Sequence, residues 1–152
     1  MKAILTSVAL MFVSAVAVAA APRVPSSAPS PAALASPAPA GSSVYFIEPA
    51  DGATVPQTFT VKFGLKGMTI APAGTDQPNT GHHHLMIDES TLPDMTQPLP
   101  ANAHVVHFGK GQTETQLTLP PGQHTLQLVF ANYLHVPHSP PVVSKRITVT
   151  VE

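Results

Sequence analysis

Three consecutive histidines, His82 to His84, run directly into a short apolar segment, and their side chains could bind a metal ion. Side chains of an extended strand alternate between its two faces, so His82, His84 and Met86 share one face. Two imidazoles on one rigid strand can hold the same ion, because neutral imidazole is a common metal ligand. The Met86 thioether adds a soft donor suited to copper(I). The spacing predicts a copper or zinc site on this strand.

A purely structural role is the alternative for the same residues. A His at a strand end often bonds a backbone carbonyl, and a Met on an apolar strand usually fills the core. The composition favours a metal, because the chain has 8 His and 0 Cys. Without Cys there is no disulfide framework, no iron–sulfur cluster and no thiolate zinc site, so His, Met or carboxylate must supply the ligands.

The elements expected to position these residues are strands. Gly81 precedes the His strand, and the polar residues Asp88 and Glu89 follow it. Other alternating or apolar segments recur with turn residues between them, at residues 44–47, 59–65, 68–70, 104–108, 113–119, 124–130 and 142–151. About seven or eight short strands without an amphipathic helix predict an immunoglobulin-like antiparallel β-sandwich, with an open barrel as the second choice.

The strand pattern also predicts the core and two connections. The inward-facing residues are expected to be Phe46, Phe59, Val61, Phe63, Leu85, Ile87, Leu126, Leu128, Phe130, Ile147 and Val149. Gly109-Lys110-Gly111 is typical of a hairpin turn between the segments at 104–108 and 113–119. The Pro-rich stretch from Phe130 to Val142 is expected to be a loop.

Two further histidines are expected near the His strand. If each strand runs antiparallel to the one before it, the His strand begins at the end of the sandwich that also carries the loop after Phe130. That loop contains His135 and His138 among prolines that would hold them in place. The predicted metal ligands are therefore His82, His84, Met86, His135 and His138, although an exposed loop is the simpler interpretation of the last two.

The chain divides into three parts. A short positive start, an apolar run and the small-residue pattern A-V-A at 17–19 predict a secretory signal peptide over residues 1–20. Residues 21–42 are mostly Ala, Pro and Ser, which predicts a disordered linker. Residues 43–152 fit one domain. We expect a periplasmic protein without an integral membrane segment after cleavage.

Charge and missing motifs exclude several function classes. The net charge is −1, and no cluster of Lys and Arg occurs, so a nucleic-acid partner is not expected. No serine-nucleophile elbow, phosphate-binding Gly-rich loop or Cys nucleophile is present, so the chain is not predicted to be an enzyme. A metal carrier or buffer is the favoured function. A cell-envelope interaction module that binds another envelope protein without metal is the alternative, and a metal-dependent oxidoreductase is the least favoured.

Distinctive motifs follow one another from Pro49 to the C-terminus. They include G-H-H-H-L-M-I-D at 81–88, H-F-G-K-G-Q-T-E at 107–114 and P-G-Q-H-T-L-Q-L at 121–128. In these motifs the chain resembles an exported bacterial family known as domain of unknown function 4399. The resemblance implies export and a single small domain, and it implies no activity. The metal site is a hypothesis based on the residues themselves.

Overall fold

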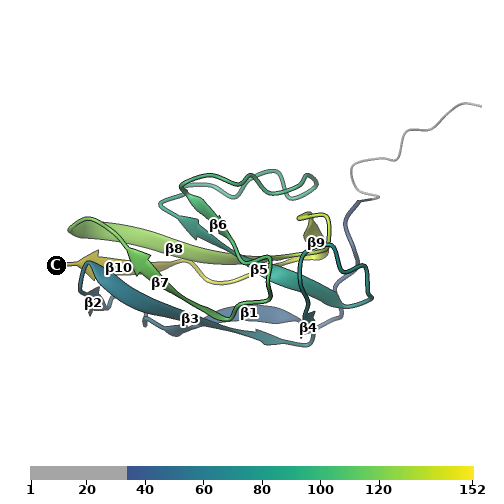
Figure 1. Ribbon diagram of the computed structural model, residues 1–152, viewed down its shortest axis with the longest axis horizontal. Coiled ribbons are helices and arrows are strands. Elements are labelled where there is room, and N and C mark those ends of the chain that lie inside the picture. The colour runs from purple at the N-terminus through teal and green to yellow at the C-terminus, as the bar shows by residue number, and fades with distance from the viewer. Residues whose placement is uncertain (1–33) are drawn as a thin grey trace, which may run out of the picture.

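The computed structural model describes residues 34–152, which form a β-sandwich of two sheets (Figure 1). The 3-stranded sheet has the order β1-β3-β7, from β1 (Ser43–Glu48), β3 (Thr58–Lys66) and β7 (Glu114–Thr118). The 7-stranded sheet contains β2 (Thr54–Val55), β4 (Thr69–Ile70), β5 (Thr80–Ile87), β6 (Val105–His107), β8 (Gly122–Ala131), β9 (Pro137–Val143) and β10 (Ile147–Val151). The predicted all-β sandwich is confirmed. The predicted signal peptide and residues 21–33 lie outside the described residues.

Within residues 34–152 no helix is long and apolar enough to cross a membrane.

The His strand β5 lies in the interior of the larger sheet. It pairs antiparallel with β8, from His82 opposite Ala131 to Ile87 opposite Leu126. Its other edge pairs with β4 near its start and with β6 near its end, where His84 lies opposite His107. Because both edges are hydrogen-bonded, the backbone that carries the histidines is held on both sides.

Apolar residues form one core between the sheets and a smaller cluster on the outer face of the larger sheet. All the predicted core residues belong to the inner core, with Phe46 only partly buried. The outer cluster consists of Met86, Leu99, Val105, Val129 and Ala131. Leu99 comes from the long β5–β6 connection, which lies over this face in Figure 1. The two faces of β5 are therefore both covered.

Two predicted connections are wrong. Gly109-Lys110-Gly111 does not close a hairpin, because β6 belongs to the larger sheet and β7 to the smaller one. The expected loop from Phe130 to Val142 instead contains β9, and the expected strand at 142–151 is divided into β9 and β10. The division occurs beside Ser144, whose hydroxyl accepts the Leu128 N–H (2.9 Å) and so replaces a backbone acceptor of the ladder.

Two strand pairs are parallel, β2–β10 and β4–β5, and the strand pattern did not predict them.

Residues 34–42, at the end of the predicted linker, lie against the sandwich. The Ala38 N–H donates to the Ser139 carbonyl (3.1 Å), and the Ser139 N–H donates to the Ser36 carbonyl (2.9 Å). The buried Asn132 side chain donates to the Leu34 carbonyl (2.8 Å) and the Ser36 hydroxyl (3.0 Å). The predicted boundary at Ser43 therefore lies inside the folded part of the chain.

A chain that begins at Ser43 is expected to be less stable than one that begins at Leu34. Truncation removes both acceptors of the Asn132 amide and opens it to water, and a hydrogen bond of this kind contributes about 0.5–1.5 kcal/mol net. Urea denaturation of the two chains measures the difference, and a chain that begins at Ala21 is the control and should match the one from Leu34. Equal stability of the chains from Leu34 and Ser43 would show that the contacts of residues 34–42 with the sandwich do not stabilise it.

Candidate metal centre

The three consecutive histidines lie on opposite faces of β5, as strand alternation requires. His82 and His84 point to the outer face and are 0% and 1% exposed. His83 points into the inner core, where its ring centroid lies 4.6 Å from that of Phe63 and 5.1 Å from that of Phe130. Two of the three imidazoles are therefore available to one site.

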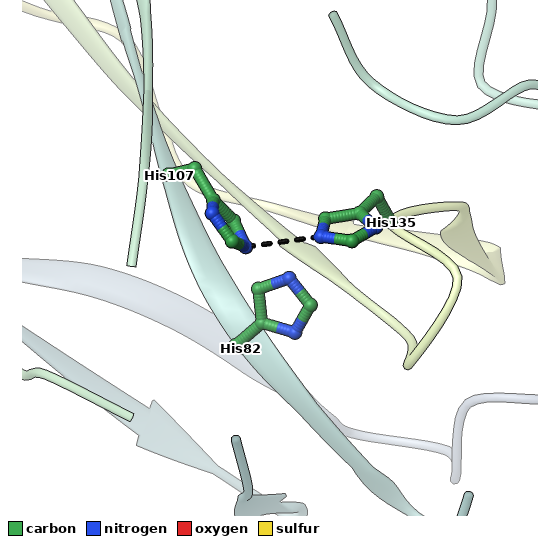
Figure 2. A group of neighbouring side chains, drawn as sticks. All are labelled: His82, His107 and His135. Carbon is green, nitrogen blue, oxygen red and sulfur yellow. Dashed lines mark hydrogen bonds between the residues drawn. The ribbon is translucent and has the colours of Figure 1, made fainter. Parts of the chain in front are cut away.

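His107 and His135 bring two more rings to the same place (Figure 2). The ring centroid of His107 lies 4.8 Å from that of His82 and 5.0 Å from that of His84. The ring of His135 lies 5.0 Å from that of His82 and 4.6 Å from that of His107. We call His82, His84, His107 and His135 the His cluster. Its members come from β5, β6 and the β8–β9 turn, so the tertiary fold assembles it.

The turn that presents His135 is fixed by hydrogen bonds. The Asn132 side-chain oxygen accepts the N–H groups of Leu134 (3.0 Å) and Val136 (3.1 Å). His135 has a φ of 66°, in the left-handed region. Its N–H donates to the Asn132 carbonyl (2.9 Å), and its own carbonyl accepts the Leu99 N–H (2.9 Å). This last bond joins the turn to the β5–β6 connection over the site.

Three buried ring nitrogens of the cluster lack the partners that buried polar atoms normally have, whereas Nε2 of His107 and Nε2 of His135 lie within hydrogen-bond distance of each other. Among residues 34–152, neither nitrogen of His82 has a hydrogen-bond partner, and neither does Nδ1 of His84. A buried polar group without a partner is destabilising, so such groups require an explanation. A metal ion coordinated by these rings would provide the missing interaction.

The separations of the ring nitrogens fit a metal ion. Nε2 of His107 and Nε2 of His135 are 3.1 Å apart. Two ligands on a tetrahedral ion with bonds of about 2.0–2.1 Å are about 3.3 Å apart, which is close to this separation. One nitrogen from each of His82, His107 and His135 lies within 4.8 Å of the others, so small side-chain movements would complete the coordination.

His83 shows that an unpaired ring nitrogen is not specific to a metal site. Both of its ring nitrogens are also buried without partners. Its neighbours are the phenyl rings of Phe63 and Phe130, which cannot bind a transition metal. Unpaired nitrogens alone therefore do not define a site, and the convergence of several imidazoles on the outer face does.

Burial keeps His82 and His84 in the metal-binding form. Burial lowers the pKa of His82 to about 4, and a charge on His107 or His135 would lower it in the same direction. Burial also lowers the pKa of His84 to about 2, and burial followed by the effect of His135 lowers the pKa of His107. His82 and His84 are thus neutral at pH 7, and neutral imidazole is the form that binds metal.

The structure brings some of the predicted ligands together and places others elsewhere. His82, His84 and His135 come together as expected. Met86 lies on the same face and packs in the outer apolar cluster with Leu99. His138 is outside the His cluster, because its Nδ1 lies 3.3 Å from the Phe130 carbonyl and its Nε2 3.2 Å from the Thr80 carbonyl.

His107 was not among the predicted ligands. Its strand was expected, but the sequence has no local signal for which residue of β6 lies opposite His84. That register follows from the path of the β5–β6 connection, where the Ile87 N–H donates to the His104 carbonyl (2.8 Å).

His124 has a structural role at the far end of β5. Its Nδ1 lies 2.7 Å from an Asp88 carboxylate oxygen and its Nε2 lies 2.9 Å from the Pro120 carbonyl. Both partners are acceptors, so only the protonated ring satisfies both. The Asp88 hydrogen bond raises the pKa of His124. Burial opposes ionisation of Asp88, but hydrogen bonds from His124 and the Thr125 N–H hold its pKa below the usual value.

The His124–Asp88 pair is expected to make stability depend on pH. The raised pKa of His124 means that its contribution is complete below pH 6.5 and is lost as pH rises through the raised value. The lowered pKa of Asp88 means that its contribution is complete above pH 3.8 and is lost as pH falls through the lowered value. The pair therefore stabilises the folded protein most between pH 3.8 and pH 6.5.

Replacing Asp88 by Asn tests this dependence, because Asn keeps an acceptor for the Thr125 N–H and tolerates the left-handed φ of 57°. We expect Asp88→Asn to lower the free energy of unfolding by about 0.5–1 kcal/mol at pH 5.5 and by much less at pH 9. The amount is discounted for the solvent exposure of the pair. Urea denaturation at the two pH values measures it. A loss that does not change with pH would show that the ion pair is not the cause.

Comparisons with known proteins identify a family and give little else. A family model described as "Domain of unknown function (DUF4399)" matches residues 61–152. No curated protein matches the chain significantly. Among solved structures, the X-ray structure of the endo-beta-1,4-mannanase from Thermotoga petrophila is similar at 17% sequence identity and a TM-score of 0.41. The match covers 73% of this chain and 20% of that chain.

Proposed function

We propose that this chain, which belongs to the DUF4399 family, binds one copper or zinc ion through the His cluster and acts as a periplasmic metal carrier or buffer. One observation carries the proposal. In the described part of the chain, the fully buried His82 ring has no partner for either nitrogen, and one nitrogen each of His107 and His135 lies within 4.8 Å of one of its nitrogens. A transition-metal ion is the ligand that explains both facts.

The donor set limits the metal. Imidazoles suit copper and zinc, whereas magnesium and calcium need oxygen ligands. Met86 packs in the apolar cluster, so a set of imidazoles alone would favour copper(II) or zinc over copper(I). Among residues 34–152, no carboxylate or hydroxyl side chain belongs to the His cluster or lines the cavity beside it, which favours a carrier over an enzyme.

An interaction module is the second candidate, supported by the edge strand β1. Tyr45 is 46% and Ile47 57% exposed on this strand, which pairs with β3 alone among the described strands. An exposed edge with apolar side chains can accept another strand. The partner would be another envelope protein, and no metal would be required.

Native mass spectrometry of the mature protein, purified without a histidine tag, tests the proposal. We expect one copper(II) or zinc ion per chain, with binding lost in the double variant His82→Ala/His107→Ala. His104→Ala is the matched control, because His104 is exposed and lies outside the cluster. A double variant that binds metal as tightly as the parent would favour the interaction module.

A further inference from the structure

A cavity of about 200 Å³ adjoins the His cluster. It is lined by His84, His107 and His135 on one side and by residues 98–101 of the β5–β6 connection on the other. The second side consists of Pro98, Leu99, Pro100 and Ala101, whose side chains are all apolar. The imidazoles therefore supply the polar side of the cavity.

The charge of a loaded site would be uncompensated. Neutral imidazoles leave the full charge of a divalent ion in place, and among residues 34–152 no carboxylate belongs to the cluster or lines this cavity. A charge held in a partly dehydrated site is costly unless a counter-charge accompanies it. An anion bound directly to the metal would supply that counter-charge.

The size of the cavity restricts the anion. A molecule of liquid water occupies about 30 Å³, so the cavity has room for a species of a few non-hydrogen atoms. Sites for drug-sized ligands are about 300–1,000 Å³, so this cavity is too small to enclose a nucleotide or a peptide. The apolar wall has no side-chain donors for a polyatomic oxyanion, so the metal must provide the main polar contact.

We propose that the metal held by the His cluster keeps one coordination position open towards this cavity, and that a small monovalent inorganic anion binds there directly to the metal. This inference rests on the proposed function. Three of the four imidazoles, those of His82, His107 and His135, can each offer one nitrogen to the ion, as in zinc and copper sites that keep an exchangeable position. Such a position would let the bound metal be passed to, or taken from, an incoming ligand.

Azide is a suitable probe, because its charge-transfer absorption appears when it coordinates copper(II). The protein loaded with one copper(II) ion is titrated with sodium azide, and we expect a saturable absorption change at one azide per metal. Ala101→Trp fills the cavity from an exposed position, so azide affinity should fall at least tenfold while one copper(II) ion is still bound. Ala103→Trp is the control, since Ala103 is exposed in the same connection and does not line the cavity.

The outcomes separate the two proposals. If native mass spectrometry finds neither copper(II) nor zinc on the parent, the proposed function fails. If one ion binds and azide produces no absorption change, the metal has no open position and this inference is overturned. Equal azide affinity in Ala101→Trp and the parent would also overturn it, because the anion would then not occupy the cavity.

Discussion

Copper(II) or zinc at a thousandfold excess over Kd is expected to raise the free energy of unfolding of the mature protein by about 4 kcal/mol. The reason is that the His cluster is assembled only in the folded chain, from β5, β6 and the β8–β9 turn. A ligand that binds the native state and not the unfolded state stabilises it by RT ln(1 + [L]/Kd). Urea denaturation with and without metal measures the change.

His107→Ala is the sharpest variant for this test. The His107 side chain is exposed, so its removal should change the stability of the metal-free protein by about 0.5 kcal/mol or less. Yet its Nε2 lies 3.1 Å from that of His135, so its loss removes one ligand from the centre of the proposed set. We expect the metal-dependent gain to fall by at least 2.7 kcal/mol, which corresponds to about a hundredfold loss of affinity.

His104→Ala should keep the full gain, because His104 lies near the Ile87 carbonyl and not in the cluster. If His107→Ala kept the full gain as well, the ion would be bound elsewhere. Binding of metal to histidines of the unfolded chain would reduce the gain to a similar extent in His104→Ala and His107→Ala, since each has lost one histidine, so it would not imitate the expected pattern.

Part of the site could be predicted because it depends on local geometry. The period of a strand places His82 and His84 on one face whatever the rest of the fold does. The approach of His135 followed from the direction of successive strands, which decides the end of a sandwich at which a connection lies. The first argument needs only the existence of the strand. The second assumed that successive strands alternate in direction, which fails at the parallel pair β4–β5, and its result held because β5 pairs antiparallel with β8.

The rest of the site depends on register and on packing. His107 joins the cluster because β6 pairs with β5 with His84 opposite it, after a long connection whose path has no local code. His138 was expected in a loop, but β9 begins at Pro137 and places its ring between two backbone carbonyls. Prolines in the segment suggested a loop, whereas an edge strand can also contain them.

The fold, like the site, could be predicted only in part. Alternating apolar residues predicted the inner core, since burial of one face is the reason for the alternation. Gly109-Lys110-Gly111 indicated a reversal of the chain, but a turn signal does not say which sheet the next strand joins. The crossover of β7 to the smaller sheet is a property of the whole sandwich.

Gly81→Ala is expected to destabilise the protein by about 3 kcal/mol and to weaken metal binding. A Cβ at position 81 would overlap the carbonyl oxygen of Ala131, and it would lie 2.8 Å from Phe130 Cε1 and 2.9 Å from His138 Cε1. The carbonyl belongs to the backbone of β8, which cannot rotate away as a side chain can. The central strands β5 and β8 would have to separate next to His82, which would also move the turn that carries His135.

Gly64→Ala is the matched control, because Gly64 is also a strand glycine and lies in β3 opposite Tyr45. A Cβ there would meet the far end of the Tyr45 ring, and that side chain is 46% exposed and free to turn outwards. We expect Gly64→Ala to cost about 1 kcal/mol or less and to leave metal affinity unchanged. Urea denaturation and metal titration of both variants make the comparison. If Gly81→Ala were no more costly than Gly64→Ala, the close approach of β5 and β8 beside the His cluster would not be required for the fold or the site.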